Sequence, residues 1–391
     1  MSKTRCCRNL VALEMGRAWL SVSLMLFAGA LQAGTALTFR GQASAWTNVN
    51  PGNDFPLWLG ARYIPQINFR AISEKSRQID FELSANVYGS GGAKAFNTWD
   101  TDGGVKPYRA WARFATPQLE LRLGLQKINF GSAAMLRPLM WFDQVDPRDP
   151  LQLTDGVWGL LGRYTFLNNA NIWLWGLYGN EGPKTWEIGG SAARTPEFGG
   201  RAQVPVPRGE AALSFHRRTA DLSSLGFSGS EPLRMPENRY GFDVKVDVGV
   251  GLWLEGAWIN KRGEVGQFAN QQIWNLGLDY TFGLGNGLHA IGEQLLFSQD
   301  REPFAFGNMT HFSAVSLSYP LSILDSLGGI VYRDWTHGNT YAFVNWKRQR
   351  DRVAFYIMAF WNPKVFQLPQ QSEGARMFAG KGFQVMVVLN H

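Results

Sequence analysis

The chain has 391 residues and a formal net charge of +7, and 18% of its residues are charged, where about 25% is usual in soluble domains. Aromatic residues make up 14% and glycines number 44, a composition that excludes a disordered chain and a coiled coil. After the N-terminus no run approaches the roughly 18 consecutive apolar residues of a membrane helix. A glycine-rich and aromatic-rich all-β protein remains.

The first 33 residues have the pattern of a secretory signal peptide. Four basic residues, the last of them Arg17, precede the apolar run 18–30, and small residues follow as far as Ala36. We predict cleavage after Ala33, with Ala36 as the second choice, so that 34–391 is the mature chain. A membrane anchor is the alternative, but the apolar run is short for one. Both cysteines lie in 1–33, so disulfides would not stabilise the mature chain.

The segment from Tyr240 to Val248 alternates strictly between apolar and polar positions. Tyrosine, phenylalanine and three valines occupy one face, while glycine, two aspartates and a lysine occupy the other. A period of two predicts a β-strand. In a soluble sandwich the apolar face would point inward, whereas in a transmembrane barrel it would face lipid and the charges would face the lumen.

Similar segments recur along the chain. We predict strands at 37–46, 58–71, 78–89, 105–115, 119–130, 157–166, 172–179, 199–205, 209–219, 238–248, 252–262, 270–282, 288–299, 310–319, 327–336, 340–347, 353–361 and 381–391. This pattern predicts a transmembrane antiparallel β-barrel of about eighteen strands, with sixteen as the alternative. The segments near 172–178 and 353–361 are apolar on both faces, so their facing stays open.

Links between the predicted strands alternate in length. Short links fall at 116–117, 207–208, 249–251, 283–287 and 349–352, and long ones at 90–104, 131–156, 180–198, 220–237, 300–309 and 362–380. Short periplasmic turns and long external loops are typical of bacterial outer-membrane barrels. This pattern places both termini on the periplasmic side.

Aromatic side chains gather near the predicted strand ends, where amphipathic rings favour a membrane–water boundary. They are Tyr63, Tyr108, Trp158, Tyr164, Tyr178, Trp258, Tyr280, Tyr319 and Trp361. The alternative is the aromatic core of a soluble β-sandwich, which eighteen strands would make unusually large.

Two features resemble known families. The last strand resembles the C-terminal strand of Gram-negative outer-membrane β-barrels, although it ends in His391 rather than in phenylalanine or tryptophan. The run 124–131 (GLQKINFG), followed by 146–150 (DPRDP), resembles a segment of porin-like proteins related to the alginate-export group. In that segment Leu125 and Phe130 replace the family's arginine and tryptophan. The resemblance implies a channel or an exporter, without a particular solute.

If the apolar faces meet lipid, the early strands place charged side chains in the lumen. These predicted pore-lining residues are Arg62, Arg70, Asp80, Glu82, Arg109, Arg113, Glu120 and Arg122. Arginines in a pore favour anions, because guanidinium binds carboxylate and phosphate in bidentate fashion. The alternative is a cross-strand network of opposite charges that stiffens the wall without selecting a solute.

The link 131–156 is too apolar for a loop in water. Leu136, Leu139, Met140, Trp141 and Phe142 favour burial, and porins commonly fold their third external loop into the lumen. By that resemblance the loop would constrict the pore, which its charged residues Arg137, Asp143, Asp146, Arg148 and Asp149 would line. A loop packed on the wall, with prolines and aspartates setting its turns, is the alternative.

Other chemistries find little support in the sequence. The histidines are scattered without metal-ligand spacing, and Ser313 near His311 has no third partner, so we expect no catalytic residues, metal or cofactor. No basic run suggests nucleic acid. The sequence predicts an outer-membrane channel that contacts lipid and passes small polar or anionic solutes. An exporter or surface-polysaccharide partner and an outer-membrane hydrolase are the alternatives.

Overall fold

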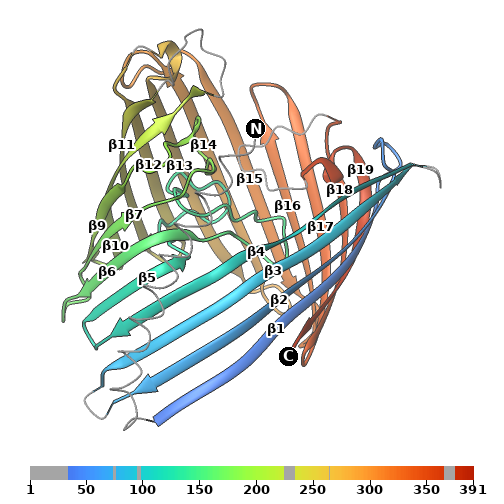
Figure 1. The fold of residues 1–391 in the computed structure, drawn as a ribbon. Helices are drawn as coiled ribbons and strands as arrows, with labels where there is room; N and C mark the ends of the chain where they lie inside the picture. The colour runs from blue at the N-terminus through green and yellow to red at the C-terminus, as the bar shows by residue number, and fades with distance from the viewer. Residues whose placement is uncertain (1–33, 74–75, 95–97, 224–233, 264, 365–374) are drawn as a thin grey trace, which may run out of the picture.

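The computed structural model describes residues 34–73, 76–94, 98–223, 234–263, 265–364 and 375–391, which form one antiparallel sheet closed into a barrel (Figure 1). β1 (Gly34–Val49) pairs with β2 (Leu57–Ile72) on one side and with β19 (Lys381–Asn390) on the other, which closes the ring. No helix in this part of the chain is long and apolar enough to cross a membrane. The predicted signal peptide 1–33 lies outside the described residues.

Between these strands the sheet follows chain order. The remaining strands are β3 (Gln78–Lys94), β4 (Thr98–Ala115), β5 (Leu119–Gln126), β6 (Val157–Thr165), β7 (Asn171–Leu177), β8 (Gly190–Ser191), β9 (Glu197–Val206), β10 (Gly209–Asp221), β11 (Arg234–Asp247), β12 (Gly251–Lys261), β13 (Asn270–Phe282), β14 (Leu288–Asp300), β15 (Met309–Pro320), β16 (Asp325–Asp334), β17 (Asn339–Arg350) and β18 (Val353–Trp361). Two short 3₁₀ helices, η3 (Gly266–Phe268) and η4 (Ala375–Phe378), lie in links.

The wall of the barrel contains eighteen strands. β8 has two residues and pairs only with the end of β10, while β7 pairs directly with β9. Every described strand of the wall corresponds to a predicted one, so the prediction of about eighteen is confirmed and the alternative of sixteen is wrong. Closure pairs the edges of the first and last strands, which lipid would not tolerate unpaired.

Several strand boundaries differ from the prediction, and the differences around β3, β4 and β5 change the path of the links. The link predicted at 90–104 is largely strand, because the glycine-rich ends of β3 and β4 stay in register as far as Lys94 and Thr98. β5 ends at Gln126 rather than at 130, where the chain leaves the wall for the lumen. Gly124 precedes this exit with a φ of +123°, and a Cβ there would collide with the carbonyl oxygen of Ala110.

Large apolar side chains cover the outside of the barrel. Leu213 on β10 and Leu276 on β13 are 69% and 61% exposed, whereas Asp243 on β11 and Glu255 on β12 point inward and are fully buried. On β11, Tyr240 is exposed outward, while inward-facing Lys245 lies near Asp279 and above the ring of Trp253. An apolar exterior around a polar interior is the polarity of a barrel that spans a membrane, not of a soluble sandwich.

The structure shows which face of β7 and which face of β18, the two strands that are apolar on both faces, points outward. On β18, Phe355 and Ile357 are exposed on the outer face, whereas Tyr356 and Met358 are buried on the inner face. On β7, Leu174 is exposed outward and Trp175 is buried inward. At these two places the inner wall is therefore apolar as well.

Most of the predicted boundary aromatics lie on the outer surface. Trp158, Tyr164, Tyr178 and Trp361 are among the exposed large side chains. Tyr108 differs: it occupies an irregular position in the β3–β4 pairing, and its side chain lines an internal cavity. The extra residue at such a bulge shifts the alternation of the strand, which explains the error.

His391 completes the closing strand. Its backbone N–H and carbonyl both pair with Gly41, its imidazole lies 5.9 Å from the Tyr63 ring in stacked geometry, and Nε2 lies 3.0 Å from the Tyr63 hydroxyl. A Cβ on Gly41 would collide with the imidazole. The histidine thus packs as an aromatic ring beside the seam of the barrel.

The apolar exterior predicts how the barrel responds to an added charge. Leu276→Arg, near the middle of β13, should lower the free energy of unfolding by about 2–4 kcal/mol, because the charge would lie in hydrocarbon. Leu327→Arg, near the start of β16, should cost only about 0–1 kcal/mol, because its charge can reach water. Urea titration in lipid vesicles, followed by tryptophan fluorescence, measures both. Equal costs would contradict a lipid-facing exterior.

Candidate functional site

The link from Lys127 to Gly156 enters the lumen and lies against the opposite wall (Figure 1). Its apolar side chains, among them Met140, Trp141 and Phe142, are buried. The Phe142 ring meets Trp175 of β7 edge-on at 5.4 Å and His216 of β10 at 4.9 Å. These contacts place the loop inside the barrel, and we call residues 127–156 the inner loop.

Two wall carboxylates hold the backbone of the inner loop. Glu255 of β12 accepts the N–H groups of Ser132, Ala133 and Leu139 at 2.7, 2.9 and 2.7 Å. Glu293 of β14 accepts those of Ala134, Met135 and Leu136 at 2.6, 3.1 and 2.6 Å. Bonds from N–H donors to an ionised carboxylate are stronger than neutral ones, so these two side chains fix the path of the loop.

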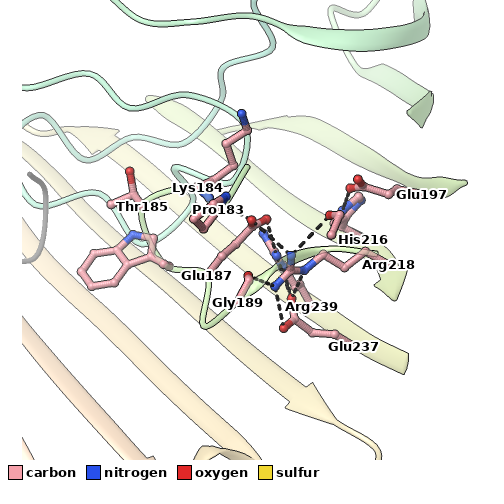
Figure 2. Close-up of polar contacts among 12 residues, drawn as sticks. Pro183, Lys184, Thr185, Glu187, Gly189, Glu197, His216, Arg218, Glu237 and Arg239 are labelled. Atoms are coloured by element: carbon pink, nitrogen blue, oxygen red, sulfur yellow. Dashed lines mark hydrogen bonds and ion pairs between the residues drawn. The ribbon is translucent and has the colours of Figure 1, made fainter. Parts of the chain in front are cut away.

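A second inward link, 178–196, braces the inner loop. Trp186 donates its indole N–H to the carbonyl oxygen of Arg137 at 2.7 Å. The next residue, Glu187, pairs with Arg239 at 2.7 Å and with Arg218 at 3.1 Å (Figure 2). The indole and the carboxylate together attach this link both to the inner loop and to the wall.

Glu187 belongs to a buried charge cluster on β10, β11 and β12. Glu237 binds Arg218 at 2.6 Å and Lys261 at 3.3 Å, so that each cation of the cluster meets a carboxylate. His216 lies beside it, with its Nε2 at 3.1 Å from the Glu197 carboxylate (Figure 2). Its Nδ1 accepts the indole N–H of Trp175, which leaves Nε2 to donate to Glu197. Paired charges of this kind anchor the loops and are not free to meet a solute.

These anchors were not among the predicted site residues. Arg218, Glu237, Arg239 and Lys261 all occupy inward positions, so strand alternation places them in the lumen, but it does not show which charges a loop will cover. The position of the link 178–196 in the folded chain shows which of these inward charges hold a loop and which face open space in the lumen.

The open part of the lumen lies on the other side of the inner loop. A cavity of about 170 Å³ separates residues 144–155 from the inner wall of β1–β4, β18 and β19. Trp46, Arg62, Lys106 and Tyr108 line it from the wall, and Asp146, Arg148, Asp149 and Asp155 line it from the loop. We call this space the constriction cavity.

The predicted constriction residues occupy two different environments. Asp146 and Arg148 form a pair at 2.6 Å on the cavity side, and Asp149 accepts the N–H groups of Leu151 and Leu153. Burial raises the pKa of Asp149 above the ordinary aspartate value, and the two backbone donors oppose that rise. Arg137 and Asp143 instead pair with each other at 3.0 Å inside the loop, where both are buried.

Most of the predicted pore-lining charges meet around a second cavity, of about 390 Å³, on the same inner wall. Its charged lining consists of Arg40, Arg70, Asp80, Glu82, Arg113 and Arg122. Asp80 binds Arg113 at 2.6 Å and Arg70 at 3.1 Å, and Glu120 binds Arg122 at 2.7 Å. We call this space the arginine cavity.

The other predicted arginines lie apart from this group. Arg109 donates to the carbonyl oxygens of Thr154 and Tyr108, so it holds the inner loop instead of pairing with a carboxylate. Arg62 lines the constriction cavity. Arg70 and Arg113 therefore form cross-strand ion pairs, as the alternative of a charge network predicts, whereas Arg62 and Arg109 form none among the described residues.

Comparison with known proteins supports the fold. No protein-family model matches the chain, and no curated protein matches it. OccD3 of Pseudomonas aeruginosa superposes with a TM-score of 0.56 at 11% identity, over 92% of this chain and 93% of that one. An anion-selective porin from Comamonas acidovorans gives a TM-score of 0.48 at 12% identity, over 92% and 100%, which is too low to support an argument. The likeness to OccD3 confirms the porin-like barrel architecture.

The carboxylate anchors predict the dynamics of the inner loop. Glu293→Gln should speed hydrogen exchange of the Ala134, Met135 and Leu136 amides by about tenfold to a hundredfold, because hydrogen bonds to a charged acceptor contribute about 1.5–3 kcal/mol. Hydrogen–deuterium exchange with mass spectrometry measures this. Glu302→Gln, at an exposed carboxylate in the β14–β15 link, is the control and should change nothing. Unaltered exchange in E293Q would show that packing alone holds the loop.

Proposed function

We propose that this chain is an outer-membrane channel that passes small polar or anionic solutes by diffusion. The closed eighteen-strand barrel with an apolar exterior supports residence in the outer membrane, because bacterial barrels of this kind reside there. The inner loop leaves a narrow space along one wall, lined by both charged and apolar side chains, which limits passage to small molecules.

The preference for anions rests mainly on one observation. Four arginines but only two carboxylates line the arginine cavity, so the inner wall carries an excess of positive charge there. Positive side chains along a pore lower the energy of an entering anion and raise that of a cation. Pairing with Asp80 and Glu120 offsets part of this charge and leaves a moderate preference.

The alternatives are less well supported. A polysaccharide exporter needs a wide continuous lumen, whereas the inner loop and the link 178–196 occupy the β10–β14 side of this barrel. For a hydrolase, Ser313 would need a basic partner, but its hydroxyl donates to Gln294 at 2.5 Å and accepts the indole N–H of Trp335 at 2.7 Å. Among the described residues no group of histidine, cysteine and acidic side chains could hold a metal ion.

The charge excess predicts the ion selectivity of the purified protein. In planar bilayers across a KCl gradient, the reversal potential should show preference for chloride. Arg40→Gln with Arg70→Gln should reduce the chloride-to-potassium permeability ratio by up to about fivefold, because a unit charge about 4 Å away contributes about 1 kcal/mol in water. Arg217→Gln on the outer surface of β10 is the matched control and should leave the ratio unchanged. A channel without conductance would contradict the proposed function, and an unchanged ratio in the double variant would contradict the assigned role of the arginines.

A further inference from the structure

One stretch of the inner wall is apolar. A pore through which polar solutes diffuse does not need such a surface. Inward-facing residues of β18 and β19 form a buried apolar cluster, and Trp46 of β1 and Leu151 of the inner loop pack against it. Met358 and Met386 of this cluster, together with Trp46 and Leu151, line the constriction cavity. We call these four side chains the apolar strip.

The sheet register places a cation directly beside the apolar strip. Met386 of β19 is the cross-strand partner of Trp46, and Ser44, two positions from Trp46, is the partner of Arg62 on β2. A Cβ on Gly60, which pairs with Trp46, would collide with the indole ring, so glycine at that position makes room for the ring to lie along the wall. The guanidinium of Arg62 lies over this ring at 5.8 Å from its centroid.

Among the described residues, Arg62 forms no ion pair or hydrogen bond with a carboxylate, and Asp149 of the inner loop attracts it across the cavity without contact. Among these residues the other close contact of Arg62 is the ring of Tyr88 at 5.9 Å, and its Nε is buried without an acceptor. The remaining cations of the constriction cavity are paired, Lys106 with Asp155 at 2.8 Å and Arg148 with Asp146 at 2.6 Å. Asp149 accepts two N–H groups of its own loop. The guanidinium of Arg62 therefore forms no ion pair in this cavity and keeps donors for a solute.

The geometry points to a binding position for an organic monoanion that has a flat apolar body, an inference that rests on the proposed function and names its solute class. The carboxylate meets the guanidinium of Arg62, which offers bidentate hydrogen bonds in a partly desolvated place. The apolar body lies on Trp46 and the two methionines, whose flexible thioethers adapt to its shape and contact aromatic rings favourably. A small inorganic anion gains nothing from the strip, and an organic cation of the same shape is repelled by Arg62.

Transport of matched probes tests this assignment. Proteoliposomes holding the full barrel are given acetate, phenylacetate or phenethylammonium, and chloride conductance is recorded separately in planar bilayers. Wild-type protein should pass phenylacetate faster than acetate despite its larger size, and faster than phenethylammonium. Met386→Thr should reduce the phenylacetate-to-acetate ratio by about threefold, because it removes apolar contact area. Arg62→Gln should slow both carboxylates. Met309→Thr, at the start of β15 and away from the cavity, is the control and should leave the ratio unchanged.

The outcomes separate this inference from the proposed function. Heat-modifiable gel mobility checks that each variant is folded, and Met358→Leu, which keeps the strip apolar, should retain the wild-type ratio. If the protein conducts chloride but passes acetate faster than phenylacetate, the binding position is wrong and the proposed channel function is still supported. The same holds if Met386→Thr leaves the phenylacetate-to-acetate ratio unchanged. If no ion or solute passes, the proposed function itself fails.

Discussion

The need to pair every backbone N–H and C=O group in a medium without water shapes the whole molecule. A strand in lipid finds partners only in neighbouring strands, so the sheet closes on itself through β1 and β19. Closure then creates an outside that meets lipid and an inside that can hold water. The period of two along each strand assigns alternate side chains to these two environments, as Tyr240 and Asp243 of β11 illustrate.

The same rule explains how the inner loop can leave the wall. A loop inside the barrel has backbone groups that the sheet cannot satisfy, and the wall must supply their partners. Glu255 and Glu293 accept six of its N–H groups, while Asn275 donates to the carbonyl oxygen of Leu136 at 2.7 Å. The polar interior of the barrel thus acts as the binding partner of its own loop, and the cavities that a solute can enter lie along the inner wall of β1–β5, β18 and β19.

The sequence predicts the wall far better than the lumen. Alternation is local, so the strands could be located from residues such as Tyr240 to Val248 alone, and the apolar character of 131–156 was enough to predict burial of that loop. The partners of the loop are not local: Glu293 lies more than 150 positions from the amides that it holds. Alternation likewise fails at Tyr108, where an irregular pairing shifts the alternation of β4. It also does not show that Arg137 pairs inside the loop while Arg148 lines the cavity.

The way in which the inner loop is held has a consequence for how this barrel can diversify. Both carboxylates accept hydrogen bonds from the main chain of the loop and not from its side chains. Neither binds the two residues between Leu136 and Leu139, and one of these, Pro138, has no N–H group. At the six positions whose N–H groups bind these carboxylates, a change of side chain leaves the N–H donor in place, unless the new residue is proline. The anchored segment 132–139 is largely buried, whereas residues 144–155 of the same loop line the constriction cavity. The side chains that face the cavity can therefore change while the hydrogen bonds that hold the loop are retained.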